Sequence, residues 1–454
     1  MRELDPQEIL ERIWERDATL WTGDDEAKWL GWLDEPARMQ QRVSELDRFA
    51  GDARGEFDSF VVLGMGGSSL APEVFRRLFG AGELHVLDTT HPKAIRALEA
   101  SLDLGRTLFV SASKSGTTLE TRSHTDYFWE RSGKEGVRFA AVTDPGSALE
   151  QLAKERGFRA VFAGEPTIGG RYSALSPFGL VPAALANVDL GALLSRAASM
   201  VDACRGEDSP GLELGFRLGQ GWQEGQDKVC IDPTPGGFGL WAEQLLAEST
   251  GKEGKGLIPA PGEDADGPDR QPGEVELDEP LDLGAEFFRW EFATAVAGAV
   301  LGINPFDQPN VQEAKDRTNA ILEKGGDPPL DLEGSADELF AQATEGDYVC
   351  IQAFVEPNAE NEAVLDRLVA RARGTGCVVT HGYGPRYLHS TGQLHKGGPP
   401  TGVFLQVIDD TGPELPIPGR RFGFGRLIRA QAAGDYSALK ERGRRVARIR
   451  LEDI

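Results

Sequence analysis

Apolar positions in the first half of the chain fall into short runs, which are separated by longer stretches with helical spacing. The apolar runs lie at residues 60–63, 84–87, 107–110 and 139–142, and the helical stretches at 72–78, 92–102, 119–131 and 147–155. Strand–helix alternation is typical of βαβ units, so it predicts a parallel, doubly wound sheet. Ligands of such sheets bind at the C-terminal ends of the strands.

A similar pattern returns in the second half, with strands predicted near 229–231, 348–355 and 377–380 and helices at 212–222, 287–300 and 361–373. Residues 1–50 have helical spacing, and residues 260–284 predict a loop or insertion because they are rich in Pro, Gly, Asp and Glu. An amphipathic terminal helix is expected to carry Lys440, Arg442, Arg444, Arg445, Arg448 and Arg450. The predicted units are an N-terminal helical segment (1–50), a first α/β domain (51–200), a second α/β domain (201–410) and a tail with the basic helix (411–454).

Composition excludes several classes of partner. The 454 residues include 48 Lys and Arg against 73 Asp and Glu, which gives a formal net charge of −25. This argues against nucleic acids and anionic membrane surfaces, because binding to them relies on Lys and Arg. The sequence contains no apolar run of membrane-spanning length and no signal-peptide pattern at its N-terminus. The four cysteines form no CxxC pair, which indicates free thiols in a reducing cytoplasm and no zinc site.

The stretch from Ser113 to Thr118 directly follows one predicted strand and precedes a helix. It combines hydroxyl residues, one Lys and Gly116, so backbone N–H groups, the positive end of a helix dipole and hydroxyl donors converge. This pattern predicts an anion site suited to a phosphate. It is not a Walker loop, because GxxxxGK[ST] is absent. An ordinary Ser/Thr-rich helix N-cap is the alternative interpretation.

Two glycine-containing turns add further candidates. Gly64–Ser68 follows the first strand, and its glycines allow backbone to approach a ligand, but GxGxxG is not matched, which disfavours a nicotinamide site. Two glycines precede Arg171 and allow its guanidinium to enter a cleft; the alternative is a surface arginine in a turn.

The later candidates suit proton transfer. Gln244 and Glu248 are four residues apart and share one face of a predicted helix. Glu248 lies at the end of that helix, where the dipole disfavours the charged carboxylate and suits a general base; an exposed glutamate is the alternative. His381, His389 and His395 follow a strand with spacings that suit no standard zinc motif, which favours proton transfer over metal binding.

Taken together, these motifs resemble phosphoglucose isomerase, most closely the isomerase half of transaldolase–phosphoglucose isomerase fusions, from about Phe57 to Gly398. The matching motifs are GMGGS at 64–68, SKSGTTLET at 113–121, ESTGK at 248–252, FDQ at 306–308 with Lys315, and HSTGQL at 389–394. The resemblance implies two α/β domains with doubly wound parallel sheets of the sugar-isomerase (SIS) type, with N-terminal helices and a C-terminal helix.

The resemblance also implies residue roles. Glu248 would move a proton between C1 and C2, Arg171 would stabilise the enediolate, and His389 would help to open the sugar ring. Lys315 would lie near the ring oxygen. Substrate binding is implied for Gly67, Ser68, Ser113, Lys114, Ser115, Thr118, Gln244 and Gln308.

In the well-known enzymes the histidine motif lies between the glutamate and lysine motifs, whereas here it follows Lys315. His381 and His395 are therefore alternatives to His389. The chain is also shorter than typical members and lacks a transaldolase half. A family histidine often comes from the neighbouring subunit, so a homodimer is implied.

The reaction implied is the interconversion of glucose 6-phosphate and fructose 6-phosphate through a cis-enediolate, without a redox cofactor or a metal. One alternative is an isomerase of another sugar phosphate, such as mannose 6-phosphate. A second is a non-catalytic sugar-phosphate-binding regulator. A regulator has no need for Glu248, Arg171 and Lys315, whose presence counts against it.

Overall fold

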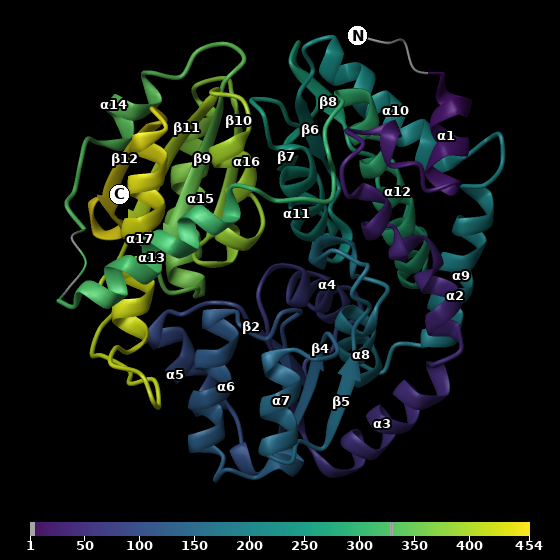
Figure 1. Ribbon diagram of the computed structural model, residues 1–454. Helices are drawn as coiled ribbons and strands as arrows, with labels where there is room; N and C mark the ends of the chain where they lie inside the picture. Colours follow the sequence, from purple (N-terminus) through teal and green to yellow (C-terminus); the bar gives the residue numbers. More distant parts are fainter. Residues whose placement is uncertain (1–4, 327, 329) are drawn as a thin grey trace.

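The computed structural model describes residues 5–326, 328 and 330–454, and describes residues 311–314 only as part of a helix. The first half contains a five-stranded sheet in the order β2-β1-β3-β4-β5, and every neighbouring pair is parallel (Figure 1). The predicted parallel α/β architecture is therefore confirmed, although the last strand was not predicted. The strands are β1 (Ser59–Leu63), β2 (Leu84–Leu87), β3 (Thr107–Ala112), β4 (Phe139–Thr143) and β5 (Ala160–Ala163).

The helices that connect these strands begin and end close to their predicted positions. The central strand β3 is buried along its whole length, and the Phe109 ring stacks on Phe128 at 4.7 Å and on Phe139 at 5.1 Å. These stacked rings pack the last turn of the following helix against β3 and β4. The helices are α4 (Leu70–Leu78), α5 (Pro92–Ser101), α6 (Leu119–Arg131), α7 (Ala148–Glu155) and α8 (Pro177–Leu185).

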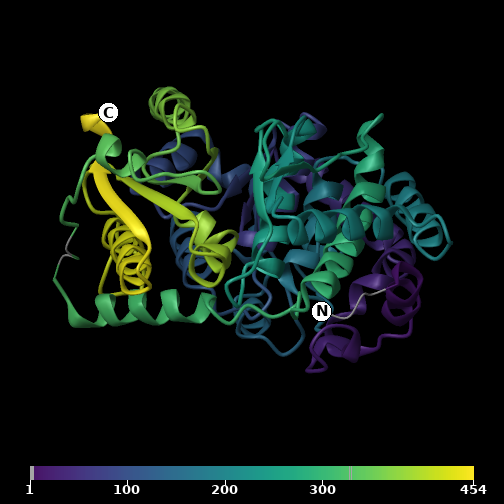
Figure 2. The same ribbon diagram turned by 90° about the horizontal axis from the view of Figure 1, so that it is seen from above.

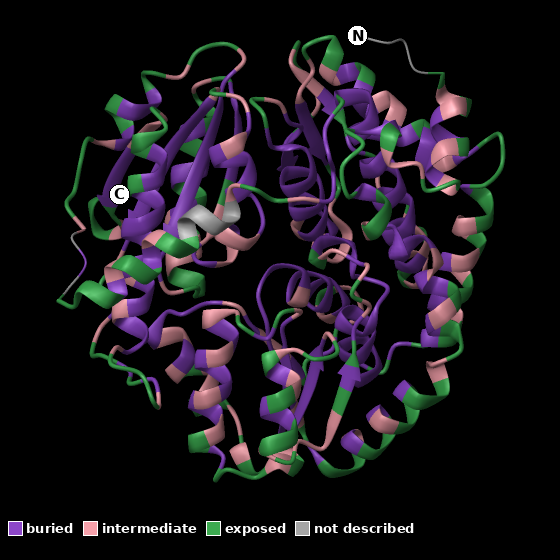
Figure 3. Ribbon diagram, in the orientation of Figure 1, coloured by how far each residue is buried: buried purple, intermediate pink, exposed green. Residues whose placement is uncertain are grey.

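The second half contains two smaller parallel sheets. One has three strands in the order β7-β6-β8, and the other has four in the order β10-β9-β11-β12. Their strands are buried along the whole length in the interior of each sheet, at β6, β9 and β11, and only in part at the sheet edges (Figure 3). They are β6 (Lys228–Ile231), β7 (Ile258–Pro261), β8 (Arg270–Pro272), β9 (Tyr348–Phe354), β10 (Val378–Tyr383), β11 (Gly402–Ile408) and β12 (Arg445–Arg450).

Helix α12 is apolar on all sides and is buried almost throughout, because α9, α10 and α11 pack around it. Next to the four-stranded sheet, α13 lies beside α17 (Figure 2). The helices of this half are α9 (Leu190–Ala203), α10 (Pro210–Gln223), α11 (Phe238–Thr250), α12 (Leu283–Leu301), α13 (Val311–Lys324), α14 (Ala336–Phe340), α15 (Ala359–Arg373), α16 (Gly392–Gly397) and α17 (Phe424–Glu441).

The N-terminal segment is helical as predicted, with α1 (Pro6–Trp14), α2 (Glu35–Gln40) and α3 (Val43–Glu56) separated by short 3-10 turns. Its tryptophans attach it to the body. The Trp21 indole donates a hydrogen bond of 2.9 Å to the Ala295 carbonyl, and the Trp32 ring stacks on Tyr172 at 5.4 Å.

Two predictions about irregular segments need correction. The basic tail is not one helix, because α17 ends at Glu441 and Arg445–Arg450 form β12, which pairs in parallel with β11. That pairing satisfies the backbone groups along the edge of β11, a possibility that helical spacing does not reveal. Residues 260–284 are not wholly a loop either, since β8 pairs with β6.

The four cysteines are free, as predicted, and the structure shows that all four are buried. No helix within the described residues is both long enough and apolar enough to cross a membrane. The proposed domain boundaries stay a prediction.

Candidate active site

The hydroxyl-rich loop joins the end of β3 to the start of α6. The Ser113 and Thr118 hydroxyls lie 2.9 Å apart, and the Gly116 N–H donates to Ser113 Oγ at 3.1 Å. Gly116 has a φ of +70°, and a Cβ there would come within 2.3 Å of the Leu149 nitrogen, so the turn requires glycine. The side chain of Thr118 does not cap α6. The helix N-terminus is thus left available to an anion, as the sequence predicts.

A cavity of about 300 Å³ opens beside this loop, where four elements meet. The loop and α6 form one wall, and the others come from α13, from α17 and from the 3-10 turn η10 (Arg386–His389). Its polar lining includes Ser115, Thr118, Glu120, Lys315, His389 and Gln431. The fold therefore brings Ser115, Thr118, Lys315 and His389, predicted from separate motifs, to one cavity.

Lys114 is oriented differently from its neighbours. Its ammonium lies 2.5 Å from Asp144 Oδ2 and donates to the Glu165 carbonyl at 3.0 Å. Its side chain is not part of the cavity lining. The structure therefore does not bring the Lys114 ammonium to the predicted phosphate position, because a carboxylate on the next strand's loop holds it.

The glycine-rich loop after β1 packs against the turn that carries Arg171. A Cβ on Gly67 would lie 1.9 Å from the Gly170 carbonyl oxygen, so these two backbones touch only because position 67 is glycine. Gly66, with a φ of +56°, packs on the backbone of His389. Ser68 is half-buried in the same turn. This loop therefore sets how closely Arg171 and His389 approach each other.

Arg171 is 1 % exposed, so the alternative of a surface arginine is wrong. Its Nη1 lies 3.2 Å from Glu248 Oε1 and donates to Gln308 Oε1 at 2.8 Å. The other guanidinium nitrogens donate to Ser249 Oγ at 2.8 Å, to the Pro305 carbonyl at 2.7 Å and to the Asp307 carbonyl at 2.9 Å. A fully bonded guanidinium beside a carboxylate is a rigid source of positive charge.

Glu248 and Gln244 share one face of α11, as their spacing predicts. Gln244 Nε2 donates both to Glu248 Oε2 at 2.9 Å and to the His389 carbonyl at 2.8 Å. Glu248 is only 9 % exposed, which excludes the alternative of an ordinary surface glutamate. Gln244 thus connects the Arg171–Glu248 pair to the segment that lines the cavity.

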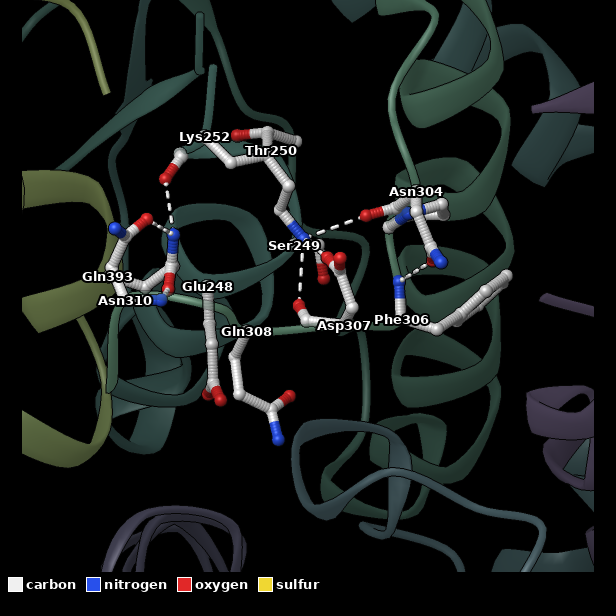
Figure 4. A network of polar contacts seen from close by, with 12 residues as sticks. Glu248, Ser249, Thr250, Lys252, Asn304, Phe306, Asp307, Gln308, Asn310 and Gln393 are labelled. Carbon is white, nitrogen blue, oxygen red and sulfur yellow. Dashed lines mark hydrogen bonds and ion pairs between the residues drawn. The ribbon is translucent and has the colours of Figure 1, made fainter. Parts of the chain in front are cut away.

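Lys252, which the sequence analysis did not single out, anchors the loop that carries Gln308 (Figure 4). Its ammonium lies 2.7 Å from the carbonyls of both Asn304 and Asp307 and 2.5 Å from Asp307 Oδ1. Burial, reinforced by the charge of Arg171, lowers the pKa of Lys252 to about 8. The feature of the sequence that could have identified Lys252 is its position in the ESTGK motif, four residues after Glu248.

His389 Nε2 lies 2.9 Å from Glu120 Oε1. Burial of Glu120 raises its pKa, but the charge and hydrogen bond of His389, with a contribution from Lys315, outweigh burial and lower that pKa to about 2. An ionised carboxylate can only accept, so Nε2 carries the hydrogen and Nδ1 is left without a hydrogen-bond partner among the described residues. Glu120 lies in the SKSGTTLET motif at 113–121, but the motif alone does not predict this contact with His389.

The two alternative histidines lie elsewhere. His381 is exposed, 4.0 Å from Glu362, and lines a separate cavity of about 690 Å³. His395 is buried, with its ring nitrogens 3.5 Å from Cys350 Sγ and 3.2 Å from Gln352 Nε2. Of these three histidines, His389 is the one that the fold places beside the hydroxyl-rich loop.

The site therefore combines three chemical abilities. A helix N-terminus with hydroxyls and Lys315 can hold an anion, a partly buried carboxylate beside a guanidinium can carry a proton next to a developing negative charge, and an imidazole can exchange a proton with a ligand in the cavity.

The chain is similar in sequence to known phosphoglucose isomerases. Residues 33–204 match the family model for phosphoglucose isomerase, which includes the hydroxyl-rich loop and Arg171 but not Glu248, Gln308, Lys315 or His389. A glucose-6-phosphate isomerase of Synechococcus sp. (strain JA-2-3B'a(2-13)) is 36% identical over 217 residues, which are 44% of this chain and 40% of that protein. The chain thus matches less than half of that relative's length.

Two further matches reach into the second half. The glucose-6-phosphate isomerase of Symbiobacterium thermophilum is 27% identical over 395 residues, with 66% of this chain and 88% of that protein covered. The crystal structure of a glucose-6-phosphate isomerase from Chlamydia trachomatis has a TM-score of 0.54 and 20% identity, and the match covers 70% of this chain and 78% of that one. The structural likeness shows the fold alone. By the family model and these relatives, the chain is similar to the phosphoglucose isomerase family, whose model matches its residues 33–204.

Proposed function

We propose that the chain is an aldose–ketose isomerase that interconverts glucose 6-phosphate and fructose 6-phosphate. The observation that carries the proposal is the pairing of Glu248 with Arg171 at 3.2 Å, which Gln244 links to the backbone of His389 in the cavity beside the hydroxyl-rich loop. Isomerisation through an enediolate needs one carboxylate to carry a proton between adjacent carbons and a fixed positive charge to stabilise the oxyanion. These two side chains provide both.

The phosphate would lie at the N-terminus of α6, where Ser113, Ser115 and Thr118 present hydroxyls. Lys315, an exposed residue of the cavity lining, adds positive charge. This remote contact positions the reacting carbons without taking part in bond breaking. The backbone of Gly67 and Ser68 would complete the sugar-binding wall.

His389 would open the sugar ring. Glu120 holds the imidazole by Nε2, so Nδ1 is free to exchange a proton with the ring oxygen or the anomeric hydroxyl. Glu248 would then remove the proton from one carbon and return it to the next. Arg171 would stabilise the enediolate, while Gln244 and Gln308 keep Glu248 and Arg171 in place.

We further propose that the chain acts in the cytoplasm as a homodimer. The family resemblance supports this, and size-exclusion chromatography with light scattering measures the assembly directly. A monomer with full activity would contradict it.

The deciding experiment is a coupled assay of glucose 6-phosphate formation from fructose 6-phosphate. Glu248→Gln keeps the size of the side chain and removes its basicity, so we expect kcat to fall by about 10³-fold or more. Glu213→Gln, on the exposed face of α10, is the matched control and should retain wild-type kcat.

Each other result has a defined meaning. Full activity of Glu248→Gln would move the base to another residue. Turnover of mannose 6-phosphate but not fructose 6-phosphate would replace the proposed substrate. Binding of sugar phosphates without turnover of any would make the protein a regulator.

A further inference from the structure

Gln431 connects the C-terminal helix α17 to the proton-transfer side of the site. Its amide Nε2 donates to Glu120 Oε1 at 2.7 Å, and its Oε1 accepts from the Thr90 hydroxyl at 2.8 Å. Gln431 is 2 % exposed, and it lines the same cavity as His389. It lies outside the stretch that carries the family motifs, which ends near residue 398.

The direction of each hydrogen bond is fixed. Because Glu120 is ionised, it can only accept, so the amide nitrogen of Gln431 must face it. The hydroxyl of Thr90 then meets the amide oxygen. One carboxylate oxygen, Oε1, therefore receives both the His389 imidazole at 2.9 Å and the Gln431 amide at 2.7 Å.

The same helix also holds the segment that carries His389. Asp435, one turn after Gln431, lies 2.5 Å from the buried ammonium of Lys396 and accepts a hydrogen bond of 2.7 Å from the Tyr387 hydroxyl. Tyr387 is two residues before His389 in η10. Helix α17 thus contacts Glu120 directly and holds the turn that carries His389 through Tyr387.

We propose that Gln431 is a positioning residue for the isomerase reaction: it fixes the Glu120 carboxylate, and through it the imidazole of His389, in the orientation that ring opening requires. This inference rests on the proposed function. Gln431 itself does not exchange a proton with the substrate.

The first variant is Gln431→Met, which fills similar space without a donor. Loss of a hydrogen bond to a charged group typically costs a factor of about 10–100, so we expect kcat to fall by that factor with KM nearly unchanged. Gln271→Met is the matched control, since Gln271 is similarly buried and donates to the Leu218 and Gln226 carbonyls, away from Glu120 and from η10. The control should lose stability to a similar extent but keep kcat.

The second variant, Gln431→Glu, separates positioning from packing. The new carboxyl would face Glu120, whose own titratable neighbours are His389, Lys315 and His124; burial lowers the pKa of His124 to about 4, so that ring is uncharged in this pH range. At pH 8.5 the new carboxylate would repel Glu120, whereas near pH 6 a proton shared between the two carboxyls restores a hydrogen bond. The ratio of variant to wild-type kcat should therefore rise about tenfold from pH 8.5 to pH 6. A purely structural defect would leave that ratio constant.

A spectroscopic readout is independent of turnover. In protein labelled with 15N-histidine, the ring nitrogen signals of His389, assigned with His389→Asn, should shift in Gln431→Met and stay unchanged in Gln271→Met. Wild-type kcat and unshifted His389 signals in Gln431→Met would overturn the inference. Absence of isomerase activity in the wild type would instead overturn the proposed function. If Gln431→Met does not fold, Thr90→Val removes the orienting hydroxyl and should reproduce a weaker form of both changes.

Discussion

His389 and Glu120 are 269 positions apart in the chain, yet the imidazole Nε2 of one lies 2.9 Å from the carboxylate of the other. The pair forms where the C-terminal end of the first sheet meets η10 of the second half. Because the carboxylate is buried and also accepts from Gln431, the ring has one defined orientation beside the anion-binding loop.

From this pair we expect His389→Asn to lower kcat for fructose 6-phosphate by about 10²–10³-fold, since a general acid–base group is lost. His381→Asn should have wild-type kcat, because His381 lies in another cavity. His395→Asn should lower the melting temperature more than kcat, because the His395 ring, on α16, is buried against β9. Steady-state kinetics with thermal melts separate the three; a kcat loss in His381→Asn alone would reassign the ring-opening histidine.

Arg171→Lys retains a positive charge but cannot replace the guanidinium. The arginine uses Nε, Nη1 and Nη2 to bond four neighbours while it faces Glu248, and an ammonium has only three donors at one point. We expect kcat to fall by about 10²–10³-fold, the usual loss when an oxyanion contact is removed. Arg217→Lys, at an exposed ion pair with Glu274, is the control. Near-normal kcat in Arg171→Lys would show that charge alone suffices.

Substitution of a hydroxyl side chain and substitution of the lysine in the hydroxyl-rich loop should give different defects. Ser115→Ala removes a cavity hydroxyl, so KM for fructose 6-phosphate and the inhibition constant of inorganic phosphate should both rise by about 10-fold or more, as expected for one hydrogen bond to a charged group. Lys114→Met should leave both constants within about twofold and lower the melting temperature, because its ammonium is bound to Asp144. A large KM increase in Lys114→Met would mean that the lysine reorients toward the phosphate.

Glu243 provides a pH-dependent stability test away from the reacting groups. It is 7 % exposed and has no hydrogen-bond partner among the described residues; burial raises its pKa to about 7, although Arg386 opposes the shift. The folded state thus binds a proton more tightly than the unfolded state, whose carboxyl has an ordinary pKa near 4.5. The contribution of the Glu243 carboxyl to the free energy of unfolding is therefore fully present below pH 4.5 and is lost as the pH rises from 4.5 to 7.

We expect Glu243→Gln to be nearly neutral at pH 4.5 and to raise the free energy of unfolding at pH 8 by on the order of 3 kcal/mol. Urea denaturation at both pH values measures this difference. Glu213→Gln should show no such dependence, since Glu213 is exposed. A destabilised Glu243→Gln at pH 8 would mean that the ionised carboxylate is paired in solution.

Several elements could be predicted because their determinants are local. The apolar runs of β1 to β4 and the helices between them lie close to the predicted ranges, and the turn around Gly116 follows from its residue types alone. Glu248 and Gln244 share a face because helical geometry fixes neighbours four residues apart. Such features depend on a few consecutive residues.

The sequence by itself determined the parallel α/β architecture, the anion-binding turn and the candidate base. Only the tertiary structure decided that Arg445–Arg450 pair with β11, that Lys114 contacts Asp144, and that His389 rather than His381 or His395 meets Glu120. In each of these cases the partner lies far along the chain or on another strand. The physical reason is that the unpaired backbone groups of a strand edge, and a buried charge, need a complementary group, and tertiary packing decides which group lies within reach. A local sequence pattern does not contain that information.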